Sequence, residues 1–293
     1  MLDLRDHLVS LVAVFLALAI GMLIGSSFLA GSSVDGLKRE FAILRTENRV
    51  QQANVNGLQD QLKKHKEFER FSMPLLVNNQ LQWRRVAIIQ TGDYSGATQS
   101  AKAALDAAGA QVVSVTTLSD LSAPGAASRI RQALKQTSGA WNIADPPGTA
   151  LSIIAKSVVG GETPEALDAF EKRGLLSKSG DYDLRLNKVV IVGGSKQSAD
   201  GRPMRVDLPL IEKLSSLNVA VVGCEPMVAE TSYVPSWHRK EIATVDNVDD
   251  PAGQTALVFA VAGDTGNFGV KASADRMTPE YLEKSLWRSE RPR

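Results

Sequence analysis

The run from Leu8 to Leu29 reads LVSLVAVFLALAIGMLIGSSFL, and it decides how the rest of the chain is organised. Its 22 residues carry no charge. As an α-helix they would span about 33 Å, which exceeds the ~30 Å hydrocarbon core of a bilayer. The run therefore predicts a single membrane-spanning anchor over residues 1–33. A cleaved signal peptide is the competing interpretation, but its apolar region is usually only about 7–15 residues long.

Small residues recur at every fourth position of this segment, and on a helix they form one flat stripe. They are Ala13, Ala17, Gly21 and Gly25. The last two form a GxxxG motif, which lets two helix backbones approach closely in lipid. The stripe predicts a dimerisation face, although Gly and Ala are common in membrane helices of every kind.

The charges that flank the segment leave its orientation open. Lys38, Arg39 and Arg45 follow it, whereas Arg5 precedes it between two aspartates. A count of Lys and Arg weakly favours a cytoplasmic position for the large part of the chain. Long domains, however, translocate largely regardless of such charges.

The composition excludes several functional classes. The 293 residues carry a net charge of +1, so there is no basic field for nucleic acid. The single cysteine excludes an internal disulfide framework, and three scattered histidines argue against a multi-histidine metal site. The chain beyond the anchor is long enough to form a sizeable core.

A heptad pattern begins at Val34, after the Gly31–Ser33 break, and predicts a coiled coil over residues 34–72. Seven of the ten a and d positions are apolar, while the positions between them are almost all polar. The a positions are Val34, Phe41, Asn48, Val55 and Leu62, and the d positions are Leu37, Leu44, Gln51, Leu58 and His65.

Asn48 lies in the middle of this narrow seam. A buried Asn at an a position costs stability but selects two parallel strands in register. We therefore expect a parallel homodimer, because the membrane stripe and the seam both ask for a parallel partner. The alternatives are a single solvated helix and a helix that packs against another protein. Pro74 is expected to end the helix at Met73.

From residue 73 to residue 287 the pattern alternates between strand and helix. This predicts an α/β domain with a mainly parallel, helix-covered sheet of Rossmann-like or flavodoxin-like type. The expected strands are Arg85–Gln90, Gln111–Thr117, Lys188–Val192, Asn218–Val222 and Thr255–Ala262. The expected helices are Ala97–Ala108, Ser122–Thr137, Ala150–Val159, Pro164–Arg173 and Leu208–Leu217. A short closing helix over 279–287 and a disordered tail over 288–293 complete the domain.

No catalytic motif emerges from this domain. The loop Thr91–Gly96 lacks the glycine spacing of a dinucleotide fingerprint, and Gly193–Lys196 lacks the ending of a phosphate loop. There is no Gly-x-Ser-x-Gly elbow. We expect a protein that is not an enzyme. The alternative is a site built from the loops after the strands, which carry Asp93, Tyr94, Lys196 and Glu225.

Metal ligands are sparse. Cys224 and Met227 are three residues apart across a proline turn, and thiolate and thioether are the ligands that Cu(I) prefers. We name this incomplete pair as the candidate metal site and expect no cofactor other than a copper ion. An acidic group, Asp246, Asp249 and Asp250, has turn-forming neighbours and is interpreted as a turn.

Two stretches of the chain carry a family resemblance. They are His7–Gly21 with the following Leu-Ile-Gly25, and Ile242–Leu257, which contains Val-Asp-Asn-Val-Asp, continued by Asn267-Phe-Gly-Val-Lys271. Both resemble the bacterial MctB family of copper transporters in the mycobacterial envelope. The resemblance implies a single-pass envelope protein with its large domain outside the cytoplasm and a role in copper homeostasis. It supplies no catalytic residues.

A related corynebacterial branch, SteB, is associated with cell separation. It works there with a membrane partner in the control of peptidoglycan hydrolases. The alternative function is therefore a coiled-coil scaffold that binds an envelope protein and regulates envelope enzymes.

Overall fold

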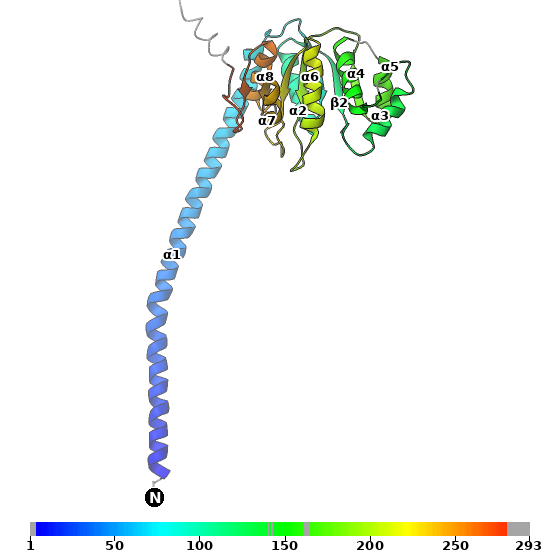
Figure 1. Cartoon of the computed structure of the whole chain (residues 1–293). Helices are drawn as coiled ribbons and strands as arrows, with labels where there is room; N and C mark the ends of the chain where they lie inside the picture. Colours follow the sequence, from blue (N-terminus) through cyan, green and yellow to red (C-terminus); the bar gives the residue numbers. More distant parts are fainter. Residues whose placement is uncertain (1–3, 140, 142, 161–163, 280–293) are drawn as a thin grey trace, which may run out of the picture. The chain divides into compact units, whose positions relative to one another are not determined.

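The structure is a computed structural model, and it describes residues 4–139, 141, 143–160 and 164–279 (Figure 1). The side chains of residues 4–6 and 27–35 are not described. The chain divides into two compact units, Met1–His65 and Lys66–Arg293.

The first unit contains most of one long helix, α1 (Leu4–Val77). Within it, His7–Ser26 has a mean hydropathy of 2.7 and is long and apolar enough to cross a membrane. The expected break at Gly31–Ser33 is wrong, because the helix continues through it. A glycine inside a helix costs only about 1 kcal/mol, which well-formed helix on both sides can absorb.

The expected end of α1 at Met73 is also wrong. The helix continues past Pro74 to Val77. Met73 and Val77 are both buried in the core of the second unit. Their burial holds the last turn in place although Pro74 contributes no backbone N–H to it.

The second unit is built on a seven-stranded sheet in the order β3-β2-β1-β4-β5-β6-β7. All neighbouring pairs are parallel except β2 and β3, which are antiparallel. The strands are β1 (Arg85–Gln90), β2 (Gln111–Leu118), β3 (Leu176–Gly180), β4 (Lys188–Val192), β5 (Ala220–Cys224), β6 (Ala243–Val245) and β7 (Asn267–Phe268).

Helices cover both faces of this sheet, as expected for buried parallel strands (Figure 1). The end of α1, α2 (Ser95–Ala107) and α8 (Pro251–Ala262) cover one face. The other face carries α3 (Ala126–Leu134), α4 (Pro146–Gly160), α5 (Pro164–Lys172), α6 (Leu208–Ser216) and α7 (Val234–Trp237). A π-helical turn, Pro203–Asp207, leads into α6, and a 3-10 turn, His238–Lys240, follows α7.

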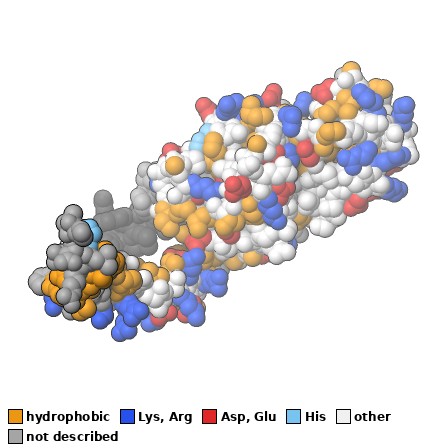
Figure 2. All heavy atoms as spheres, turned by 90° about the horizontal axis from the view of Figure 1, so that it is seen from below, with side chains coloured by type: hydrophobic (Ala, Val, Ile, Leu, Met, Phe, Trp, Pro, Cys, Tyr) orange, Lys and Arg blue, Asp and Glu red, His pale blue; other side chains and the backbone are white. Residues whose placement is uncertain are grey.

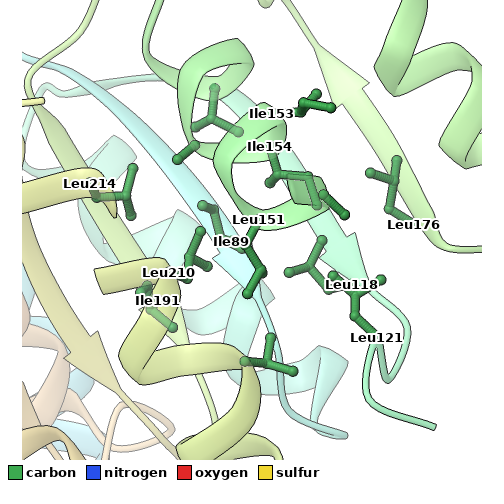
Figure 3. Close-up of a cluster of buried hydrophobic side chains, with 14 of the residues drawn as sticks. Ile89, Leu118, Leu121, Leu151, Ile153, Ile154, Leu176, Ile191, Leu210 and Leu214 are labelled. Carbon is green, nitrogen blue, oxygen red and sulfur yellow. The ribbon is translucent and has the colours of Figure 1, made fainter. Parts of the chain in front are cut away.

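Alternate strand residues form two hydrophobic cores. Ile89 and Ile191 face α4 and α6, where they meet Leu151 and Leu210 (Figure 3). Ile88 and its neighbours on the opposite face pack against α2 and α8. This period of two fixes the direction of every strand residue, including those that lead into the loops.

The prediction of a strand over Thr255–Ala262 is wrong, because this stretch belongs to α8. A short apolar run does not distinguish a buried strand from a buried helix. The deciding signal lies just before it: Asp250 accepts a hydrogen bond from the backbone of Ala252, and Pro251 occupies the first helical turn.

Three strands were not expected, namely β3, β6 and β7. β3 has the polar sequence Leu-Ser-Lys-Ser-Gly at the sheet edge, and β7 has only two residues. The expected helix over Ser122–Thr137 is shorter than predicted. The closing helix falls, except for Pro279, outside the described residues, and so does the whole tail.

Candidate functional site

The candidate site lies where the carboxyl ends of β1, β4, β5 and β6 meet at one edge of the sheet. The chain order reverses between β1 and β4, and open α/β sheets bind ligands outside this switch point. The loop after β1 begins at Thr91, and the loop after β4 begins at Gly193.

Backbone contacts hold these two loops together. Thr91 and Gly92 both donate their N–H groups to the carbonyl of Val192, at 2.9 and 3.1 Å, and Asp93 donates to the carbonyl of Gly194. A Cβ on Gly92 would lie 2.4 Å from backbone atoms of Gly193 and Gly194. Only glycine permits this approach, so the backbone itself fills the space at the switch point.

Arg202 links the loops through two ion pairs. Its guanidinium lies 2.8 Å from Asp93 and 2.6 Å from Asp200. The hydrogen bond from Arg202 lowers the pKa of Asp93 against the opposing effect of burial. Burial alone would raise the pKa of Asp200, but hydrogen bonds from Arg202 and Tyr233 lower it to about 2. Both carboxylates are therefore charged and satisfied at neutral pH.

A hydroxyl completes this cluster. Ser195 donates from Oγ to Asp93 at 3.0 Å and accepts from Arg202 at 3.2 Å. Tyr233 donates a short hydrogen bond to Asp200. A nucleophilic serine needs a neighbouring base that can take its proton, and the carboxylate beside Ser195 is already committed to Arg202. The contacts of this cluster join the loop after β1 to the loop after β4.

Asp207 is fully buried and contacts the loop after β1. Its Oδ2 accepts from Thr91 Oγ1 at 3.1 Å and from Trp237 Nε1 at 2.9 Å. Its Oδ1 has no hydrogen-bond partner in the part of the chain that the structure describes. Burial raises the pKa of this carboxyl to about 7.

A second ion pair lies at the same edge of the sheet, directly after β5. Glu225 is fully buried, and Lys271 Nζ lies 2.6 Å from its Oε1. Glu225 also accepts from the hydroxyl of Ser232 and the backbone N–H of Tyr233. The carboxylate is therefore fully engaged within the protein.

The sequence-predicted loop residues do converge on this edge. Tyr94 donates its hydroxyl to the carbonyls of Ser195 and Val228, and the Lys196 amine lies 5.5 Å from the centre of the Tyr94 ring. All four predicted loop residues, Asp93, Tyr94, Lys196 and Glu225, therefore contact other residues of the protein. Sequence reasoning missed the residues Asp200, Arg202, Asp207, Tyr233 and Trp237.

The candidate copper ligands lie in different environments. Cys224 is fully buried in the core beside α8, and burial, followed by the charge of Glu225, raises the pKa of its thiol. Met227 is 45% exposed. Among the residues described, no group of three or more His, Cys, Asp and Glu is arranged to hold a metal ion. The Cys224 and Met227 pair stays a prediction.

The acidic group at 246–250 is engaged with backbone donors. Asp246 accepts from the N–H groups of Val270 and Lys271, Asp249 accepts from Met227, and Asp250 begins α8. This agrees with the turn that the sequence predicts.

The predicted dimerisation residues lie on α1 and do not shield one another from solvent. The seam residues Leu37, Phe41, Leu44, Val55, Leu58 and Leu62 are between 46% and 64% exposed. In the membrane segment, a Cβ on Gly21 or Gly25 would meet nothing within 4 Å. A shallow groove of about 550 Å³ runs beside Ala17 and Gly21. Among the described residues, nothing packs against these small residues.

Comparison with known proteins gives a consistent result along the whole chain. The family model described as "Copper transport outer membrane protein, MctB" matches residues 1–279. Proteins named copper transporter MctB, from Mycobacterium bovis and Mycobacterium tuberculosis, are 22% identical to this chain. The alignment covers 95% of this chain and 99% of each relative.

Proposed function

Because this chain belongs to the MctB family of copper transport outer membrane proteins, we propose that it acts in copper transport as a non-enzymatic, membrane-anchored protein of the cell envelope. The observation that carries the proposal is the extent of the match. It includes both the apolar helix and the α/β unit, so the relatives named as copper transporters share the whole arrangement.

The apolar end of α1 supports the anchor. No residue of His7–Ser26 is buried within the described chain, and burying its leucines, valines and phenylalanine in lipid would remove that apolar surface from water. Over the face seen in Figure 2, Lys and Arg are interspersed with Asp and Glu. The protein extracted from membranes should retain its N-terminal residues. A mature N-terminus near Ser26 would identify a signal peptide instead.

The exposed seam supports a parallel homodimer. A helix of this length with an unpartnered apolar seam gains stability by burying it against a second copy. The groove beside Ala17 and Gly21 lies on the membrane segment of the same helix. A second copy in parallel would bury the seam.

The loops at the carboxyl edge of the sheet are held together by hydrogen bonds and ion pairs, and this supports a non-enzymatic role. Asp93, Ser195 and Glu225, the groups that could do chemistry there, are held by Arg202 and Lys271. A large domain outside the cytoplasm is part of the proposal and rests on the family resemblance.

The test is the copper content of cells of the source organism that lack this protein, measured by mass spectrometry after growth in added copper. We expect cell-associated copper to change and the intact chain to restore it. An unchanged copper content across the concentration range would overturn the proposal.

Direct binding of copper is a separate question. Cu(I) titration of the full chain in detergent would compare Met227→Leu with Met277→Leu, a methionine of similar exposure. Loss of binding in the first variant alone would locate copper at Cys224 and Met227. Absence of binding in the unaltered chain would exclude this pair and would leave an indirect role in transport.

A further inference from the structure

A hollow of about 910 Å³ lies at the edge of the sheet opposite to the candidate site. Its lining includes the first residues of β1 and β2, Arg85 and Gln111, and the segment just before β4. Its lining includes one tryptophan and three arginines, Trp83, Arg84, Arg85 and Arg185. Its volume is within the range of small-molecule sites, about 300–1,000 Å³.

Positive side chains outnumber negative ones in the lining of this hollow. Asp106 is the acidic residue of its lining, and the Lys102 amine already lies 2.6 Å from that carboxylate. Within the described chain, none of the three arginines has a carboxylate partner. The charge extends to the neighbouring strand, since burial and then the charge of Arg84 lower the pKa of Lys188. Guanidinium groups gathered without counter-charges favour an anion between them.

Trp83 stands at this hollow with 87% of its surface exposed. Its backbone is left-handed, with a φ of 66°, which is rare and strained for a bulky residue. The turns around it are held firmly: Arg84 donates to the carbonyl of Leu81, and the N–H of buried Leu81 donates to Ala108. The fold thus holds an indole ring in solvent beside three arginines.

We propose that this hollow binds a phosphate-bearing ligand, with Arg84, Arg85 and Arg185 around the phosphate oxygens and Trp83 against the organic part. Phosphate suits the site because a guanidinium can donate two parallel hydrogen bonds to it. More than one negative charge is needed to balance three arginines, which favours a diphosphate or a phosphodiester. The exposed indole adds apolar or stacking contact that inorganic phosphate cannot use. This site is independent of the proposed role in copper transport.

The test is calorimetric titration of the full chain in uncharged detergent with pyrophosphate, with ADP, and with glycerophosphoglycerol, the soluble headgroup of an anionic lipid. The double variant R84A/R185A should lower affinity for the bound probe at least about tenfold. The matched control R131A/K135A removes two exposed charges from α3 and the residue after it and should leave affinity unchanged. Both double variants should melt as the unaltered chain does, because the altered side chains are exposed.

Trp83→Ala provides an independent measurement. It should weaken ADP and leave pyrophosphate unaffected, because only ADP has a ring for the indole to contact. Preference for glycerophosphoglycerol over ADP would identify a lipid headgroup as the source of the phosphate, and the reverse preference a soluble diphosphate. The proposal is overturned if no probe binds, or if both double variants lose affinity equally.

Discussion

At the scale of single residues, Gly92 is a position at the switch point where an added side chain would clash with the backbone of the neighbouring loop. Gly92→Ala should lower the free energy of unfolding by about 3 kcal/mol, because the new Cβ would lie 2.4 Å from backbone atoms that cannot rotate away. Urea denaturation followed by tryptophan fluorescence measures the change.

The control for this substitution lies four residues further on. Gly96 is exposed in the first turn of α2, and a Cβ there would meet nothing within 4 Å. Gly96→Ala should be neutral or stabilise by up to about 1 kcal/mol, because alanine is the better helix former. Equal effects of the two substitutions would contradict the close packing of the loops.

Asp207 predicts a pH dependence of stability. Its pKa is about 7 in the folded protein against 3.8 as the ordinary value, so folding favours the protonated form. The folded state binds the extra proton, and the free energy of unfolding should therefore fall as pH rises from about 4 to 7, by at most about 4 kcal/mol. Asp200, with a pKa of about 2, acts below this window.

Asp207→Asn isolates this contribution, because the amide is neutral at every pH. The difference in unfolding free energy between Asp207→Asn and the unaltered chain should increase in favour of the variant between pH 4 and pH 7. The difference cancels the titration of histidines, which overlaps this range. A difference that stays constant with pH would show that Asp207 is charged in the folded protein.

The residues of the site were only partly predictable from the sequence. Glu225 directly follows β5 and Asp93 lies in the loop after β1, and the topology of a parallel sheet brings such positions together. Arg202 directly precedes the π-helical turn Pro203–Asp207 and pairs with Asp93 across 109 positions of sequence, and no local pattern signals that contact. Asp207 and Trp237 were missed because a buried polar contact between a π-helical turn and a short helix has no periodicity.

At the scale of elements, the exposed seam of α1 makes a prediction about assembly. Leu44→Glu should shift the full chain from dimer to monomer in detergent, because like charges would face each other where the dimer buries leucine. Ile43→Glu is the matched control, since Ile43 is equally exposed but lies beside the seam (59% against 56%). Sedimentation equilibrium measures both, and dissociation by both variants or by neither would contradict the heptad register.

The elements show which signals are reliable. The continuous apolar strands β1, β4 and β5 were found because their length and flanking turns are typical of buried strands. α8 is equally apolar, and its run was assigned wrongly because its starting signal, Asp250 with Pro251, was interpreted only as a turn. β6 and β7 are three and two residues long, and only their pairing with β5 and with each other makes them strands.

At the scale of the whole molecule, the two units derive their stability from different sources. The second unit has two buried cores of its own. The described apolar side chains of residues 7–65 are all exposed, and lipid, detergent or another chain could bury them. The described residues contain one helix that is long and apolar enough to cross a membrane, and a single helix cannot enclose a channel.

This difference predicts two separable thermal transitions for the full chain in detergent. Loss of helix between residues 34 and 65 should shift to higher temperature as protein concentration rises, because burial of the seam depends on association. The transition of the second unit, followed by near-ultraviolet circular dichroism of buried Tyr233 and Trp237, should be independent of concentration. Leu44→Glu should lower only the first transition and Gly92→Ala only the second. A single transition that both substitutions lower together would mean that the long helix and the α/β unit unfold as one cooperative body, and the seam would then be stabilised from within the chain.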